Sequence, residues 1–174
     1  VTGIEVKNDG SGILVCNSSL GDCPPSDVKT VEDLAEYIRT TPNIDGWKRA
    51  MINDGERVVG QPTLFGGLTN FTTFTPSSDY CTAEGNSKLY ALYYLTGTAW
   101  KEDVFGDSAG GYVPFIVDLG QGMGVSPSLH LGSEEGVRAF VQTSTGSIIE
   151  IHQPNLPIPN VKSGRGGWHT LDVN

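Results

Sequence analysis

Positive charge is scarce in this sequence. Eleven Lys and Arg stand against twenty Asp and Glu, which gives a formal net charge of −9 at pH 7. Nucleic-acid binding relies on clustered basic side chains that contact phosphates, so this balance argues against a nucleic-acid partner. Long apolar runs are missing as well, and no membrane span of about 20 residues is expected. An initiating Met and a signal peptide are also lacking, so we expect a processed or excised segment of a longer protein.

Charged residues are few, at 18%, whereas the chain contains 23 Gly and 10 Pro. This turn-rich composition is typical of exported all-β domains. Cysteine is rare too, with three in all. Cys16 and Cys23 bracket a short polar loop and are candidates for a disulfide, although both would also fit as reduced core residues. Cys81 is left over: it is unpaired, it bonds a cysteine of another segment or chain, or it replaces one partner of that pair.

What the sequence does have is alternation with a period of two. In the 56–102 stretch, large and polar residues alternate over Leu68–Thr75 and again over Ser87–Leu95. Thr96-Gly97 makes a turn, and Thr98–Lys101 is predicted to begin a further strand. Period-two alternation cut by Gly and Pro indicates an antiparallel β-meander. A four-stranded meander of this length is also the unit of a β-propeller blade.

The first forty residues predict a hairpin and one helix. Ile4–Val6 and Ile13–Cys16 alternate around a turn-forming Asn-Asp-Gly, which favours a β-hairpin. Thr30–Arg39 carries apolar residues at helical spacing, with Thr30 as its N-cap and Asp33 three residues later. We therefore expect a single short helix, inserted in a β-rich chain.

Further strands are predicted at Asp45–Ile52, Tyr112–Leu119, Val137–Thr143 and Ser147–His152. Gly120, Gly122 and Gly124 mimic a phosphate-binding loop, but no helix-forming segment follows them. We interpret these glycines as small residues at positions where sheets crowd together.

A weaker copy of the central stretch follows it. Pro62 and Pro127 lie in similar segments and are 65 residues apart, which suggests blades with long loops. The predicted fold is therefore all-β, a partial β-propeller of about two four-stranded antiparallel blades plus flanking strands, with one short inserted helix near residues 30–40. The expected division is residues 1–52 as the end of a preceding blade with the helical insertion, 53–111 as one blade and 112–174 as the last blade.

Three motifs follow one another in the central stretch. They are Gly55-Glu56-Arg57, then Phe71 to Cys81 (FTTFTPSSDYC), then Leu89 to Gly97 (LYALYYLTG). With Gly46-Trp47 before them and a Gln-Gly-x-x-x-Ser-Pro-Ser block from Gln121 after them, they resemble the C-terminal β-propeller of the PilC/PilY family. The resemblance covers most of residues 45–171 and only loosely the first forty.

Members of this family are large assembly and adhesion proteins of bacterial type IV pili. The resemblance implies a non-catalytic segment that promotes pilus assembly, counters retraction and contributes to surface attachment. It further implies an exported protein of the bacterial cell surface, at the pilus tip, the outer membrane or in the periplasm. The partners it implies are the remainder of the propeller, pilus subunits and a host or abiotic surface, with no nucleic acid and no membrane span.

Known family members bind calcium through an Asp-rich loop in the propeller. This sequence contains no such loop, because Asp103, Asp107 and Asp118 are too scattered. We therefore expect no cofactor or metal in this segment, and calcium remains an implication only for the parent protein. His130, His152 and His169 lie singly on predicted strands, where histidines are more often structural or exposed than metal-bound.

The alternative is an enzyme. Ala91–Trp100 is similar to a repeated motif of quinoprotein propellers, in which a Trp packs between neighbouring blades. The aromatic residues Tyr90, Tyr93, Tyr94 and Trp100 could stack on a sugar or form an interface, although this spacing is more often that of core residues. A quinoprotein-like or carbohydrate-binding propeller enzyme is thus the second hypothesis. No nucleophile motif accompanies it, and no catalytic residue is nominated.

Overall fold

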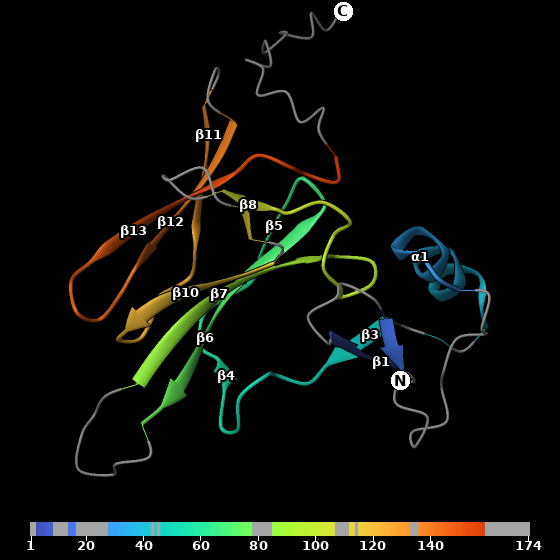
Figure 1. Ribbon diagram of the computed structural model, residues 1–174, viewed down its shortest axis with the longest axis horizontal. Helices are drawn as coiled ribbons and strands as arrows, with labels where there is room; N and C mark the ends of the chain where they lie inside the picture. The colour runs from blue at the N-terminus through green and yellow to red at the C-terminus, as the bar shows by residue number, and fades with distance from the viewer. Residues whose placement is uncertain are drawn as a thin grey trace, which may run out of the picture.

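The computed structural model describes residues 3–8, 14–16, 28–42, 44, 46–77, 85–106, 112–113, 115–132 and 136–158. Within these ranges the chain is mostly β-strand with one short helix, as the composition and the alternation predicted. The strands form three sheets, which we call the first, middle and third sheets. Figure 1 shows the first sheet and the helix on one side of the molecule and the third sheet on the other.

The first sheet has the strand order β2-β1-β3. Strands β1 (Gly3–Asn8) and β2 (Leu14–Cys16) pair antiparallel, which confirms the predicted hairpin. Strand β3 (Gly46–Arg49) lies within the strand expected at Asp45–Ile52 but ends three residues earlier than expected. It pairs with β1 in parallel, and so this sheet differs from an antiparallel meander.

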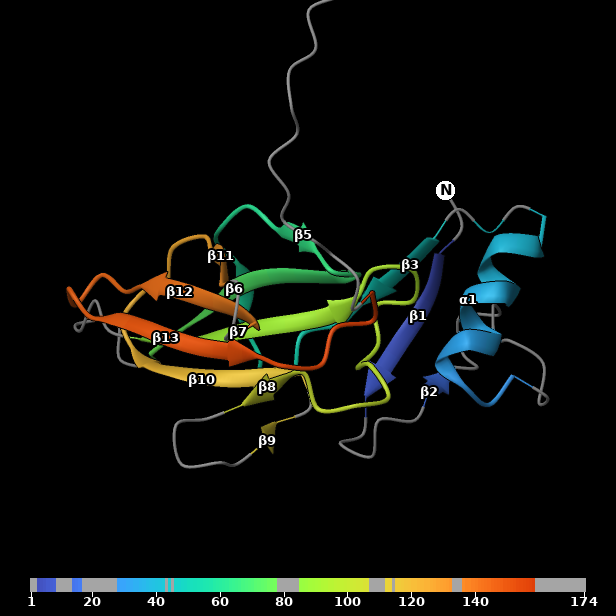
Figure 2. The same ribbon diagram turned by 90° about the horizontal axis from the view of Figure 1, so that it is seen from above.

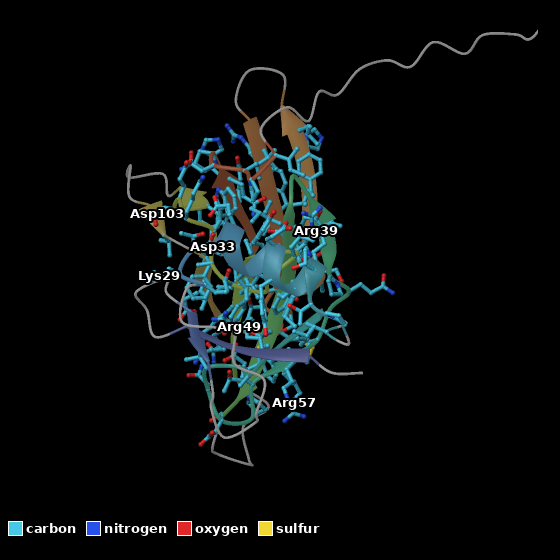
Figure 3. All side chains as sticks on the ribbon, turned by 90° about the vertical axis from the view of Figure 1, so that its right-hand side faces the viewer. Lys29, Asp33, Arg39, Arg49, Arg57 and Asp103 are labelled. Atoms are coloured by element: carbon cyan, nitrogen blue, oxygen red, sulfur yellow. The ribbon has the colours of Figure 1, made fainter. Side chains whose placement is uncertain are left out.

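Helix α1 (Val31–Thr40) is the helix that the sequence predicted. The Thr30 side chain accepts a hydrogen bond from the backbone of Asp33, and the Asp33 carboxylate accepts one from the backbone of Thr30, which completes a capping box. Asp33 and Arg39 mark its two ends in Figure 3, where the macrodipole favours an acid and a base respectively. Leu34 is fully buried and fixes the inward face of the helix.

The middle sheet is the predicted meander. Its strand order is β10-β7-β6-β4. Strand β5 also pairs with β6, at other residues of β6 than those that pair with β4. The strands are β4 (Arg57–Val58), β5 (Thr63–Phe65), β6 (Leu68–Pro76), β7 (Gly85–Tyr93) and β10 (Ile116–Gln121). Four consecutive residues of β7, Leu89 to Leu92, are all 0% exposed, because neighbouring structure covers both faces of this central strand.

The third sheet has the order β11-β12-β13-β8-β9. Its strands are β8 (Phe105–Gly106), β9 (Tyr112–Val113), β11 (Ser128–Gly132), β12 (Gly136–Gln142) and β13 (Ile148–Gln153). Strands β11, β12 and β13 form a second meander, in the region where the sequence predicted one.

Two of the predictions for the middle of the chain differ from the structure. Thr98–Lys101 forms no strand, because β10 occupies the free edge of β7 through pairs such as Ile116 with Tyr90. The strand expected at Tyr112–Leu119 is split, so that β9 pairs with β8 in the third sheet and β10 joins the middle sheet. Strands β8 and β9, which lie on either side of residue 111, are thus neighbours in one sheet.

The middle and third sheets pack against each other and share one hydrophobic core. Figure 2 shows, from above, strands β12 and β13 crossing over strands of the middle sheet. Residues from both sheets form it, including Leu68, Leu89, Ala91, Leu119, Ala139, Val141 and Ile151. Burying large apolar side chains contributes roughly 1.5–3 kcal/mol each, so this shared core is what fixes the two sheets against each other. Trp47 packs against both this core and the smaller cluster around Leu34, and it links the first sheet to the rest.

Candidate functional site

The aromatic residues singled out from the sequence separate into a buried one and an outer group. Tyr93, Tyr94 and Trp100 lie together at the end of β7 and in the turn after it. The ring of Tyr93 is 4.8 Å from that of Trp100 and 5.5 Å from that of Tyr94. Tyr94 is 38% exposed, and the other two are half-buried. These three side chains form the aromatic surface on which a ligand or partner could pack.

A charged pair borders this aromatic group. The Lys101 ammonium lies 5.1 Å above the Trp100 ring and forms a salt bridge of 2.9 Å with Glu32 of α1. That carboxylate holds the pKa of Lys101 above its ordinary value, and Lys101 in turn lowers the pKa of Glu32. Both groups are solvent-exposed, so the bridge adds little stability but ties the helix to the aromatic group.

Trp47 connects the first sheet to the same turn. Its indole nitrogen donates a hydrogen bond of 2.8 Å to the backbone oxygen of Tyr94. Its ring lies where a side chain at position 97 would project, and Gly97 adopts a φ of 68°, which favours glycine. The Thr96-Gly97 turn was expected from the sequence, whereas the partner that covers it was not.

Tyr90 belongs to the core. It is fully buried, its ring stacks on Phe71 at 5.2 Å with an interplanar angle of 6°, and its hydroxyl donates a hydrogen bond of 2.7 Å to Glu56 Oε1. Thr73 donates a second bond to the same oxygen at 2.6 Å, and the backbone N–H of Asn53 donates to Oε2 at 3.0 Å. Three donors thus hold the buried Glu56 carboxylate against the middle sheet. Because it lies in the core, Tyr90 is not available to a partner as the other three aromatics are.

Glu56 and Tyr90 have fixed protonation states in this arrangement. Burial raises the pKa of Glu56, but the hydrogen bonds from Thr73, Tyr90 and Asn53 and the charge of Lys88 outweigh it, so its pKa lies below the ordinary value. Burial and then the Glu56 carboxylate raise the pKa of Tyr90 well above its ordinary range. At neutral pH the glutamate is therefore ionised and the tyrosine is protonated. No proton moves between them, and the network acts as a clamp rather than as an acid–base pair.

Arg49 places a further positive charge near this clamp, where it interacts with Tyr90 and Glu56. Its Nη1 donates to the backbone oxygen of Gly97 at 3.0 Å, and its guanidinium lies 5.1 Å from the centre of the Phe115 ring. Burial lowers its pKa, while the Tyr90 hydroxyl and the Glu56 carboxylate act in the opposite direction. Its Nε is buried and has no hydrogen-bond partner among the described residues. Figure 3 shows Arg49 near the middle of the molecule, whereas Arg57, which follows Glu56, is exposed.

A second set of buried polar groups joins the middle and third sheets. Ser87 Oγ donates to the Gly122 oxygen at 2.6 Å and accepts from the Gly124 N–H at 2.8 Å. The Gln153 side chain donates to the Asn70 oxygen at 2.6 Å. Sequence reasoning did not nominate these residues. Their spacing does not distinguish them from the other polar residues on the same strands.

The backbone N–H groups of the three glycines near β10 all donate to acceptors within the protein. The Gly120 N–H bonds to Asp118 Oδ1, the Gly122 N–H bonds to the Gly85 oxygen, and the Gly124 N–H bonds to Ser87. A Cβ on Gly122 or Gly124 would meet neighbouring atoms at 2.9 or 3.2 Å, whereas Gly120 has open space around it. Crowding thus explains two of the three.

The histidines do not converge. His130 and His152 are exposed and lie on either side of Arg138 in one cross-strand row of the third sheet. Two strand spacings separate them, which is roughly 10 Å. Within the described ranges no group of three or more His, Cys, Asp or Glu lies close enough to hold a metal ion. His169 lies outside these ranges.

Only one of the three cysteines lies within the described residues. Cys16 is the last residue of β2, whereas Cys23 and Cys81 lie outside the described residues. The disulfide between Cys16 and Cys23, and the unpaired or inter-chain state of Cys81, stay predictions.

Comparison with protein-family models, with curated proteins and with solved structures gives no match for this chain. No helix in the described part of the chain is long and apolar enough to cross a membrane.

Proposed function

We propose that this chain is a non-catalytic β-propeller segment of a type IV pilus assembly and tip-adhesion protein, similar to the PilC/PilY family. One observation supports this best. Glu56 of the Gly-Glu-Arg motif bonds Thr73 of the Phe-Thr-Thr-Phe motif and Tyr90 of the Leu-Tyr-Ala-Leu motif. Three motifs that are separate in the sequence thus form one buried network. The resemblance therefore lies in a connected piece of architecture rather than in scattered similarities.

The order of the strands supports the propeller part of this proposal. In each of the two larger sheets, three consecutive strands form a meander and a fourth strand pairs with the last of them. The first strands of the two meanders, β5 and β11, are neighbours. There the Gln61 N–H donates to Ser126 Oγ at 2.8 Å, and Thr63 Oγ1 donates to the Pro127 oxygen at 3.3 Å. Adjacent blades of a propeller bring equivalent inner strands together in this way.

The Trp47 contact is a further point in favour. In the quinoprotein propellers that Ala91–Trp100 resembles, a Trp packs between neighbouring blades. Here a Trp from the first sheet packs on the Thr96-Gly97 turn of the middle sheet. The residue that docks is Trp47 rather than the Trp100 of the similar motif. The packing of Trp47 on the turn is nevertheless a structural use of this segment.

In this proposal the protein is exported and works at the pilus tip or the outer cell surface, where it promotes assembly, counters retraction and aids attachment. Its partners are the remainder of its propeller, pilus subunits and a host or abiotic surface. Calcium, if the parent protein binds it, is held outside this segment.

The proposal is tested in the bacterium that encodes the chain. Deleting the coding region should strongly reduce the number of surface pili counted by electron microscopy, and the intact gene should restore it. Deleting the pilus retraction motor as well should restore pili but not surface attachment. Unchanged pili and attachment in the single deletion would contradict the proposal.

The second candidate, a carbohydrate-binding or quinoprotein-like propeller enzyme, rests on the outer aromatic group of Tyr93, Tyr94 and Trp100. The rings of this group lie edge-on or tilted to one another, and the exposed Tyr94 ring offers a face on which a sugar could pack. Glycan-array binding that is lost in Trp100→Ala would favour carbohydrate recognition. Turnover of alcohols or sugars by purified protein with added quinone would favour the enzyme and overturn the non-catalytic assignment.

A further inference from the structure

The turn between β3 and β4 carries an Asp-Gly pair. Figure 1 shows the connection from β3 to β4 turning just below β4. The turn is closed by a hydrogen bond of 3.1 Å from the Glu56 N–H to the Asn53 oxygen. Asp54 and Gly55 are the two residues between the ends of this bond, and both are exposed, whereas Glu56 is buried. An Asp-Gly pair thus lies in solvent directly before the buried clamp.

The surroundings of Asp54 leave room for a reaction between its side chain and its own backbone. In any Asp-Xaa pair, the amide nitrogen of Xaa and the side-chain carbonyl carbon of Asp can close a five-membered ring, and a Cβ on Xaa hinders that closure. Gly55 has no Cβ, and a Cβ built there would meet nothing within 4 Å. Its φ of 75° lies in a region that glycine adopts without strain. Neither residue 55 nor its neighbours therefore block the ring.

The groups that would react are also free of hydrogen bonds within the described residues. Neither the Gly55 N–H nor the Asp54 carboxylate has a partner there. The other described aspartates differ from Asp54. The Asp33 carboxylate accepts bonds in the capping box, the Asp118 carboxylate accepts one from a backbone N–H, and Asp103 precedes a buried valine. Asp54 is therefore the described aspartate best placed for this chemistry.

We infer that Asp54-Gly55 is a site of spontaneous aspartate isomerisation, and that the isoaspartyl product loosens the clamp around Glu56. In the first step the Gly55 nitrogen bonds to the side-chain carbonyl carbon of Asp54, the bond from that carbon to the carboxyl hydroxyl breaks, and water leaves with the amide proton. In the second step water adds to one of the two carbonyl groups of the resulting succinimide. Opening at the former side-chain carbonyl restores Asp54, and opening at the backbone carbonyl gives isoaspartate. One water leaves and one enters, so the step needs no oxidant, reductant or other reactant.

The product lengthens the main chain by one methylene group at position 54. Two hydrogen bonds span this position, from the Glu56 N–H to the Asn53 oxygen and from the Asn53 N–H to Glu56 Oε2 at 3.0 Å. A longer link between residues 53 and 56 displaces these donors and acceptors from each other. Glu56 keeps its bonds from Thr73 and Tyr90, which reach it from the middle sheet. The clamp is thus weakened at one of its three donors.

The first test is ageing of the purified 174-residue chain for several weeks at physiological temperature and mildly acidic pH. Trypsin cleaves after Arg49 and Arg57 and releases residues 50–57, in which electron-transfer fragmentation locates an isoaspartate. We expect it at Asp54 with an unchanged peptide mass. The unchanged mass excludes deamidation of Asn53, because that reaction raises the mass. The peptide that contains Asp118 should stay unmodified. This result is measured on the purified chain and does not rest on the pilus assignment, so either can fail while the other holds.

Asp54→Glu is the matched control. It keeps the charge, but its longer side chain would have to close a six-membered ring, which forms far more slowly, so no isomer should accumulate in its peptide. The chain unfolded in guanidinium chloride gives the reference rate for Asp54. Because the turn is exposed, we expect the folded chain to react within about tenfold of that rate. A folded chain slower than this, or an isomer at Asp118 and none at Asp54, would overturn the assignment of the site.

The second test measures whether the modification weakens the clamp. The isoaspartyl fraction, separated by ion exchange, should melt about 2–4 °C below the unmodified protein, the shift expected when one hydrogen bond is lost in a chain of this size. Isoaspartyl methyltransferase with S-adenosylmethionine methylates the isoaspartyl carboxyl group and returns the residue to the succinimide, so this treatment should restore the melting temperature. Asp54→Glu aged in parallel should keep its own melting temperature. Equal melting temperatures of the two wild-type fractions would overturn the link between this site and the clamp.

Discussion

The indole ring of Trp47 fills the space that any side chain at Gly97 would need, and its nitrogen donates to the Tyr94 oxygen beside it. The first sheet therefore meets the middle sheet at a turn where only glycine fits. This contact, together with the packing of Trp47 on the shared core, explains how the short first sheet is held against the rest of the protein. It also makes position 97 sensitive for two independent reasons, the positive φ and the ring above it.

Gly97→Ala should destabilise the protein by about 2–4 kcal/mol in denaturant unfolding, since strain at a positive φ adds to overlap with the Trp47 ring. Gly146→Ala is the control, because Gly146 has a φ of 89° but open space around it. This change should cost only the backbone term of about 1 kcal/mol. If both substitutions cost the same, the ring does not occupy that space in solution.

Tyr90→Phe should lower the free energy of unfolding by about 1.5–3 kcal/mol, because it removes a donor to an ionised, buried acceptor. Tyr94→Phe changes a hydroxyl on an exposed side chain and should stay within about 0.5 kcal/mol of the wild type. Equal effects of the two changes would contradict the clamp around Glu56.

The clamp also predicts how stability depends on pH. The folded pKa of Glu56 lies below its ordinary value, so the unfolded chain binds more protons there as the solution is acidified. The stability that Glu56 contributes is present above the unfolded pKa and is lost as the pH falls through the folded pKa. We expect the stability difference between the wild type and Glu56→Gln to be largest near about pH 7 and to shrink toward about pH 3. A difference that is the same at both pH values would contradict the hydrogen-bonded state of Glu56.

Local patterns predicted the elements that depend on local chemistry. The capping residues of α1, the first hairpin and the alternation of β6 and β7 all reflect interactions within a few residues. The pairing of distant strands was not predictable in this way. Nothing near Thr98 shows that β10, which begins at Ile116, occupies the edge of β7. A strand's alternation reports that its faces are covered, not which segment covers them.

The same limit applied to the candidate site. The alternating pattern identified Tyr90 only as one of four aromatic residues. Its hydrogen bond to Glu56, which lies 34 residues earlier in the chain, could not be read from that pattern. Likewise, the sequence identified the Thr96-Gly97 turn but not Trp47 as its partner. These contacts depend on how separate sheets stack, and stacking is decided by the shape and polarity of whole faces rather than by short spacings.

The contact between the middle and third sheets gives the last prediction. Ser87 is fully buried between them, and its hydroxyl both donates to the Gly122 oxygen and accepts from the Gly124 N–H. Ser87→Ala removes both bonds and leaves a buried N–H unpaired, which costs about 1–3 kcal/mol. Because the loss is local, the amide of Gly124 should also exchange with deuterium faster than in the wild type. Ser128→Ala, at an exposed position on β11, is the control and should change neither quantity. If Ser87→Ala behaves like this control, then apolar packing alone holds the third sheet in place, and the polar groups between the sheets set only their register.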